Sequence, residues 1–169
     1  MNEYYSKTVL YAYKSLSAVM AQLDDLVLKK AVASMVDFSP CEKIAEKILD
    51  ITAQKDVIYL LKEKTALALS KLTDDERLIL DYKYFKSMGK DAYAELDFTS
   101  RAYFRKQIRV AVKFGNKLSA LGIDDAFFEQ YCLKIDFFRE LYKRVLIREK
   151  NFAKIKAKSD LLSIAERSA

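Results

Sequence analysis

The chain has 169 residues, 51% of them hydrophobic, so it can build one or two domains around a substantial core. Three Gly and one Pro are far fewer than average, which argues against turn-rich sheet folds and favours long helices. The formal net charge of +6 favours an anionic partner. The sequence contains no His and no glycine-rich phosphate motif, so catalysis, a metal site or another cofactor is not expected.

Two further features predict a soluble, cytoplasmic protein that does not enter the membrane. The N-terminus lacks the apolar segment of a secretion signal, and no run approaches the roughly 18 apolar residues of a membrane-spanning helix. Cys41 and Cys132 are far apart and lack metal-ligand spacing. We therefore expect two free, buried thiols in a reducing compartment.

The first predicted domain, residues 1–71, is a long helical hairpin. From Glu3 to Ser34, apolar residues recur at steps of three and four, which indicates one helix with a single buried seam. Ser39 and Pro40 favour the start of a second helix that runs to Lys71. The two helices are expected to pack antiparallel as a scaffold. Their seams consist of Val9, Tyr13, Leu16, Met20, Leu23 and Val27, and of Ile44, Ile48, Ile51, Ile58, Leu61 and Leu69.

The second predicted domain, residues 72–122, has the element order of a helix-turn-helix unit. Thr73 and Glu76 form a capping box, and the acidic run between them suits the positive end of a helix better than a metal site. This helix is expected to end at Gly89. A short helix over 90–96, a turn over 97–99 and a longer helix closed by Gly122 follow.

The longer helix is strongly basic. Residues 99–118 include six Lys or Arg and no Asp or Glu. Five of the six recur every fourth residue, so on a helix that turns once in about 3.6 residues they form a row that stays on one side and drifts slowly around the axis. Phe104, Ile108, Ala111 and Val112 lie on another side and are expected to dock into the core. The pattern predicts a helix that presents positive charge outward. The basic residues are Arg101, Arg105, Lys106, Arg109, Lys113 and Lys117.

Two stretches carry a resemblance to a known family. LTDDERLILDYKYF, residues 72–85, resembles the opening helix of a bacterial sigma-factor region-4 domain. DAYAELDFTSRAYFRKQIRVAVKF, residues 91–114, is similar to the helix-turn-helix of that family, as found also in ArpU-type phage transcriptional regulators. Ala94-Glu95 matches a pair in the first motif helix, and Ser100 matches the cap of the recognition helix. The chain departs from the family at Asp97-Phe98, where Leu followed by Gly or Asn is usual.

The resemblance implies DNA binding and transcriptional control, and it makes RNA polymerase a candidate protein partner. Side chains near the start of a recognition helix reach base edges, whereas Lys and Arg elsewhere neutralise phosphates. Gln107 could pair with adenine if it faces outward. The candidate base contacts are Arg101, Arg105 and Lys106; the candidate backbone contacts are Arg109, Lys113, Lys117 and Lys90; and Ser100 is the candidate cap.

The third predicted domain, residues 123–169, is a long helix and tail. The helix is expected to begin at Asp124 or Asp125 and to continue to Lys158. Its apolar residues form a seam close to a heptad repeat, and its second half is basic. Two arrangements remain open, because the helix could pack across the N-terminal hairpin or form the seam of a homodimer. The seam consists of Tyr131, Phe138, Leu141, Val145, Phe152 and Ile155.

These observations predict an all-α protein with a helical hairpin, a helix-turn-helix unit and a long final helix. The expected function is sequence-specific binding of double-stranded DNA by a transcriptional regulator without catalytic activity. The alternative is a non-catalytic helical module for protein interaction or assembly. A weaker alternative is RNA or membrane-surface binding through residues 139–158, which are rich in Lys and Arg.

Overall fold

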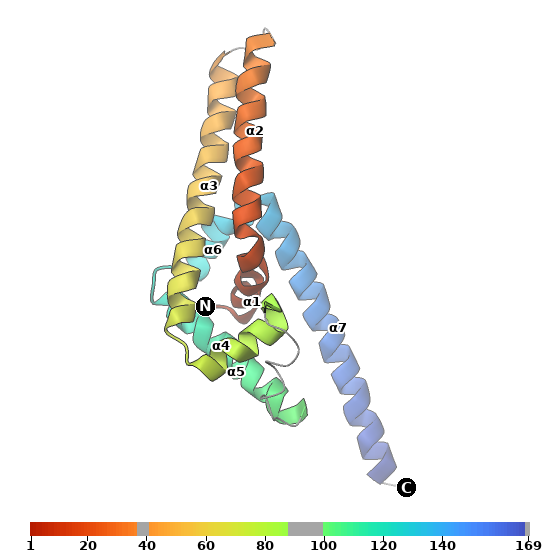
Figure 1. Cartoon of the computed structure of the whole chain (residues 1–169). Helices are drawn as coiled ribbons and strands as arrows, with labels where there is room; N and C mark the ends of the chain where they lie inside the picture. The colour runs from red at the N-terminus through yellow and green to blue at the C-terminus, as the bar shows by residue number, and fades with distance from the viewer. Residues whose placement is uncertain (37–40, 88–99, 168–169) are drawn as a thin grey trace.

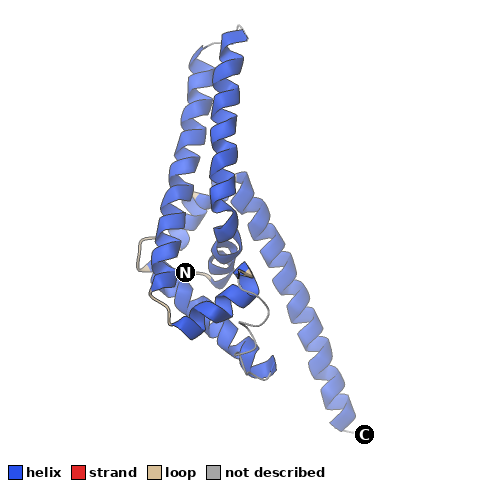
Figure 2. Ribbon diagram, viewed as in Figure 1, coloured by secondary structure: helices blue, strands red, loops and turns tan. Residues whose placement is uncertain are grey.

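The structure, a computed structural model, describes residues 1–36, 41–87 and 100–167, leaving out the side chains of 34–36, 100–101 and 152–167. Every element within these ranges is helical, which confirms the all-α prediction (Figure 2). None of these helices offers a stretch both long enough and apolar enough to cross a bilayer.

The N-terminal hairpin forms as predicted. Helix α1 (Glu3–Ala12) continues through the short 3-10 turn η1 (Tyr13–Ser15) into α2 (Leu16–Val36). Helix α3 (Cys41–Ser70) runs back beside α2, and both helices extend well beyond the rest of the molecule (Figure 1). The predicted capping residues Ser39 and Pro40 lie outside the described residues.

Helix α4 (Asp74–Leu80) begins at the predicted capping box. Thr73 accepts a hydrogen bond from the backbone of Glu76, and the Glu76 carboxylate accepts one from the backbone of Thr73. The helix continues as a π-helical turn, η2 (Asp81–Phe85), and Lys86 ends it with a positive φ of 48°. The helix therefore stops before the predicted cap Gly89, which lies outside the described residues.

Buried Asp81 explains this early stop. The Lys86 N–H donates to the Asp81 carbonyl at 2.6 Å, and the Asp81 carboxylate accepts hydrogen bonds from the backbone and hydroxyl of Ser87. A carboxylate removed from water is stable only when such donors satisfy it. These hydrogen bonds therefore fix Lys86 and Ser87 at the end of η2.

Helix α5 (Ser100–Ser119) ends at the predicted cap, Gly122. Gly122 has a φ of 89°, which an L side chain rarely adopts. The N–H of Ile123 donates to Leu118 O at 3.2 Å and the N–H of Gly122 donates to Ser119 O at 3.0 Å, the paired bonds of a Schellman motif. Leu118 and Ile123 are both buried, so the cap also seals the core.

The single final helix expected from Asp124 or Asp125 was wrong. The chain forms α6 (Asp125–Gln130), a 3-10 turn η4 (Cys132–Lys134) and then α7 (Asp136–Arg167). Ile135 leaves the helical conformation at the break and is buried. The break lets Phe128 of α6 stack on Tyr5 at 4.5 Å while α7 departs along α1 in another direction (Figure 1).

Helix α1 is the centre of the core, because it contacts α5, η2 and α7. Residues from all three predicted domains contribute to this one core, including Leu10, Phe114 and Phe138. Both cysteines are free as predicted, but only Cys132 is buried and Cys41 is exposed. Burial raises the pKa of the Cys132 thiol to about 12, so the reactive thiolate is scarce at neutral pH.

Helices α5 and α1 approach each other closely at Gly115. A Cβ added to Gly115 would lie 3.3 Å from Ser6 Cβ and would overlap Ser6 Oγ. We expect Gly115→Ala to lower the free energy of unfolding by about 1 kcal/mol, because overpacking outweighs the helix preference of Ala. Urea denaturation followed by circular dichroism measures this loss.

Adding Ser6→Ala to the Gly115→Ala variant should restore most of the stability, since the crowded hydroxyl is removed. The matched control is Gly122→Ala, which meets no neighbour but requires a positive φ. Its loss should be unaffected by Ser6→Ala. Full stability of Gly115→Ala would contradict the close packing.

Candidate nucleic-acid interface

Helix α5 buries a different side from the one predicted. Ala111 is buried as expected, but Phe104, Ile108 and Val112 are 53%, 51% and 44% exposed. The buried side of α5 instead consists of Gln107, Val110, Ala111, Phe114, Gly115 and Leu118. The predicted docking side was therefore wrong, and three apolar side chains of α5 face solvent.

The direction of α5 explains this exposure. Its later half lies under α1 and α4, where Gly115 meets Ser6. Its first turns project past α4 at the edge of the molecule (Figure 1). Phe104 and Ile108 lie on these first turns, beyond the cover that α1 gives to residues near Gly115.

Three of the candidate basic residues, Arg105, Lys106 and Arg109, are exposed on this projecting part of α5. Among the residues that the structure describes, no acidic side chain forms an ion pair with Arg105 or Arg109. Within the described part of the chain, their positive charge is therefore not neutralised by an ion pair. These two guanidinium groups are the strongest part of the predicted interface.

Lys113 has a partner instead. Its Nζ lies 2.6 Å from Glu76 Oε1 and 2.9 Å from Glu76 Oε2, so the ammonium binds both carboxylate oxygens. The hydrogen bond from Lys113 lowers the pKa of Glu76. Glu76, which caps α4, thus links α4 to α5 and neutralises the charge of Lys113. Lys117, one turn further on, is half-buried.

Gln107 cannot contact a base in this arrangement, because only 3% of its surface is exposed. It forms a side-chain hydrogen bond with Tyr103, whose ring meets Tyr82 of η2 edge-on at 5.5 Å. The contact between α5 and η2 at this point is thus made by Tyr103 and Tyr82. The suggested pairing of Gln107 with adenine was wrong.

The structure does not describe the side chains of three candidate residues. Lys90 lies among the residues that the structure leaves out, together with the short helix and turn predicted over 90–99. Ser100 and Arg101 form the first turn of α5, but their side chains are not described.

A charged cluster centred on buried Lys7, which the sequence did not reveal as a unit, joins α1 to α7. Lys7 Nζ lies 2.7 Å from Glu3 Oε1 and 2.7 Å from Glu149 Oε2. Burial lowers the pKa of Lys7, but hydrogen bonds to Glu149 and Glu3 outweigh burial and raise it overall. The one sequence signal was the spacing of Glu3 and Lys7, which suits an ion pair on a helix.

Lys83 of η2 lies beside this cluster. Burial, followed by repulsion from the charge of Lys7, lowers the pKa of Lys83 to about 8. Its ammonium lies 5.3 Å from the centre of the Tyr84 ring, and Tyr84 packs edge-on against Tyr11. The Arg148 guanidinium of α7 lies 5.5 Å from the centre of the Tyr11 ring. Cations and tyrosines thus fix α7 against α1 and η2.

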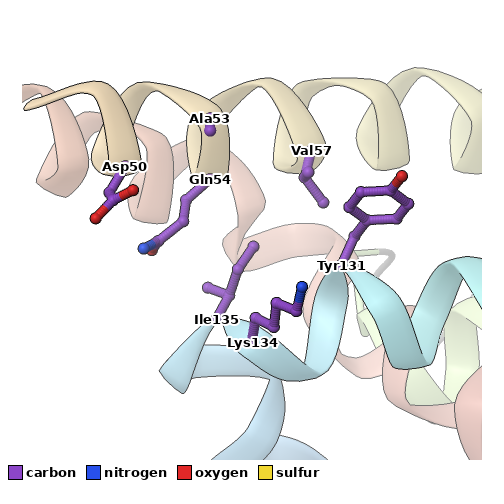
Figure 3. Close-up of a pocket in the computed structure, with 7 residues that line it drawn as sticks. All are labelled: Asp50, Ala53, Gln54, Val57, Tyr131, Lys134 and Ile135. Atoms are coloured by element: carbon purple, nitrogen blue, oxygen red, sulfur yellow. The ribbon is translucent and has the colours of Figure 1, made fainter. Parts of the chain in front are cut away.

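A shallow pocket of about 210 Å³ lies elsewhere, between α3 and the turn before α7 (Figure 3). None of the candidate DNA contacts lines it. Its walls are mainly apolar, with one carboxylate, one amide and one ammonium group. The lining residues are Asp50, Ala53, Gln54, Val57, Tyr131, Lys134 and Ile135.

Comparison with known proteins assigns the chain to no family. No protein-family model matches the sequence, and searches of curated proteins and of solved structures gave no match.

Proposed function

We propose that this protein is a DNA-binding transcriptional regulator that places the first half of α5 in the major groove. The observation that carries this proposal is the projecting start of α5, where Arg105 and Arg109 are exposed (Figure 1). An α-helix fits the width of the major groove, and recognition helices contact bases through their N-terminal residues.

The chemistry of the exposed side suits this role. Arginine can donate two hydrogen bonds to guanine, and Lys and Arg bind phosphates through charge. Arg105, Lys106 and Arg109 supply these groups over little more than one helical turn. The absence of Asp and Glu from residues 99–118 removes local repulsion of the DNA backbone.

The flanking residues would extend the contact along the backbone. Lys117 and Lys90 are proposed phosphate contacts, and Lys113 would join them only by exchanging Glu76 for a phosphate group. The resemblance of residues 72–114 to sigma-factor region 4 extends the proposal to a regulator that contacts RNA polymerase.

A salt series tests the proposal. Duplex binding should weaken as salt rises, with a log–log slope of about −3 to −4 if four phosphates are neutralised. Fluorescence anisotropy with random and selected duplex pools side by side separates general affinity from sequence preference. Binding that is absent, or that ignores salt, would reject the proposal.

A second candidate function is a helical module for protein assembly. The hairpin supports it, because Leu28, Leu49 and Tyr59 are more than 60% exposed although they are large and apolar. Helix α7 also extends away from the body and could pair with a second copy (Figure 1). Sedimentation at low and high salt discriminates the two functions, since association through apolar surfaces persists at high salt.

A further inference from the structure

We propose that the exposed apolar row of α5, Phe104 and Ile108 with Val112 behind them, recognises the 5-methyl groups of thymine in duplex DNA. This inference rests on the proposed function and adds the base chemistry that α5 would read. The three side chains are large, apolar and exposed, and their spacing of four residues places them in one row along α5 instead of scattering them over the surface.

The row lies beside Arg105 and Arg109, which form no ion pair with any acid that the structure describes. Successive residues of an α-helix are separated by about 100° around its axis. Ile108 therefore adjoins Arg105, and Val112 adjoins Arg109, three residues apart in each case, whereas Phe104 lies only about 60° from buried Gln107. The face that would enter the groove thus carries two parallel rows, one apolar and one cationic.

This pairing favours DNA over other occupants of the surface. A second copy docked on the same row would bring two sets of Arg105 and Arg109 together, and residues 99–118 contain no acid to compensate them. A purely apolar partner would bury or crowd the guanidinium groups. The major groove supplies phosphates for the cations and, at each thymine, a methyl group for an apolar side chain.

The spacing of the row also suits stacked bases. Phe104 and Ile108 are four residues apart, which is about 6 Å along a helix axis. This corresponds to roughly two steps of B-DNA, whose base pairs are about 3.4 Å apart. The preferred site should therefore contain thymines about two base pairs apart, close to guanines that Arg105 or Arg109 contacts.

Replacing thymine with deoxyuridine in the selected duplex tests the inference, since this removes only the methyl groups. Two contacted methyl groups should together be worth roughly tenfold in affinity. The wild-type chain should therefore bind the deoxyuridine duplex about tenfold more weakly. The Phe104→Ala/Ile108→Ala variant should bind both duplexes with equal affinity, whereas Arg105→Ala should bind both more weakly and keep their ratio.

The control is Leu28→Ala, an exposed apolar side chain on the hairpin, which should keep the wild-type ratio. Equal wild-type affinities for the thymine and deoxyuridine duplexes would overturn this inference and leave DNA binding standing. Self-association of the free protein that Phe104→Ala/Ile108→Ala abolishes would assign the row to a second copy. No duplex binding at all would overturn the proposed function and this inference together.

Discussion

Replacing Arg105 and Arg109 with Glu should weaken duplex binding by more than about 100-fold, because two cationic contacts are lost and two repulsive charges are added. Both guanidinium groups are exposed on the projecting turns of α5, and neither belongs to the core. The helical content measured by circular dichroism should therefore remain unchanged. Anisotropy titrations at one fixed salt concentration give the affinity ratio.

The matched control is Lys29→Glu/Lys30→Glu on α2, which makes the same change in net charge far from α5 along the hairpin (Figure 1). This variant should lose only the small affinity that follows from a lower overall charge. Equal losses in the two double variants would show that binding depends on net charge and not on the face of α5. The proposed site would then be rejected.

The structure also indicates which basic residue should not be used for this test. Lys113→Glu would place a second carboxylate beside Glu76, which now accepts hydrogen bonds from the Lys113 ammonium. A loss of DNA binding in that variant would have two inseparable causes, the repulsion of DNA by the new carboxylate and the loosening of α4 from α5. Arg105 and Arg109 avoid this ambiguity, since neither pairs with an acid in the described part of the chain.

Local signals in the sequence predicted the parts of the fold that depend on local chemistry. The capping box of Thr73 and Glu76 and the positive φ of Gly122 follow from residue type and spacing alone. The hairpin follows from two long apolar seams separated by a break. Each of these features is decided by residues close together in the sequence.

The orientation of α5 could not be predicted in the same way. The helix carries two apolar rows, one through Phe104 and Ile108 and one through Val110, Ala111 and Phe114. Periodicity alone cannot decide which row is buried. The structure buries the second, beside Gly115, where the missing side chain lets α1 approach. The sequence signal for this contact was a glycine inside a long helix. The residue that packs against it, Ser6, is more than 100 residues away in the sequence, so local patterns could not identify it.

The break before α7 has a similar origin. Tyr131 and Cys132 continue an apolar helical pattern, so local signals favour one helix through this region. The gain from stacking Phe128 on Tyr5 and burying Ile135 is visible only once α1 is in place. Tertiary packing therefore overrides the periodicity at this point.

Lys7 is the residue whose loss should destabilise the fold most among the charged side chains of α1. Only 5% of its side chain is exposed, and it binds Glu3 on its own helix and Glu149 on α7. Because its pKa is raised on folding, Lys7 contributes stability that is fully present below its ordinary pKa of about 10.4. That contribution is lost only as the pH rises through the higher pKa of the folded state.

Lys7→Met should therefore lower the free energy of unfolding at pH 7 by about 3 kcal/mol, since Glu149 is left without its cation in a site that is largely removed from water. Adding Glu149→Gln should recover part of the loss, because the uncompensated charge disappears. Lys143→Met is the control, since Lys143 pairs with Glu140 on the exposed surface of α7. Such surface pairs contribute little to stability, because water and salt screen the two charges. Equal urea midpoints for Lys7→Met and Lys143→Met would mean that the Lys7 cluster does not hold α7 to α1, and that the aromatic contacts of Tyr5 and Tyr11 suffice.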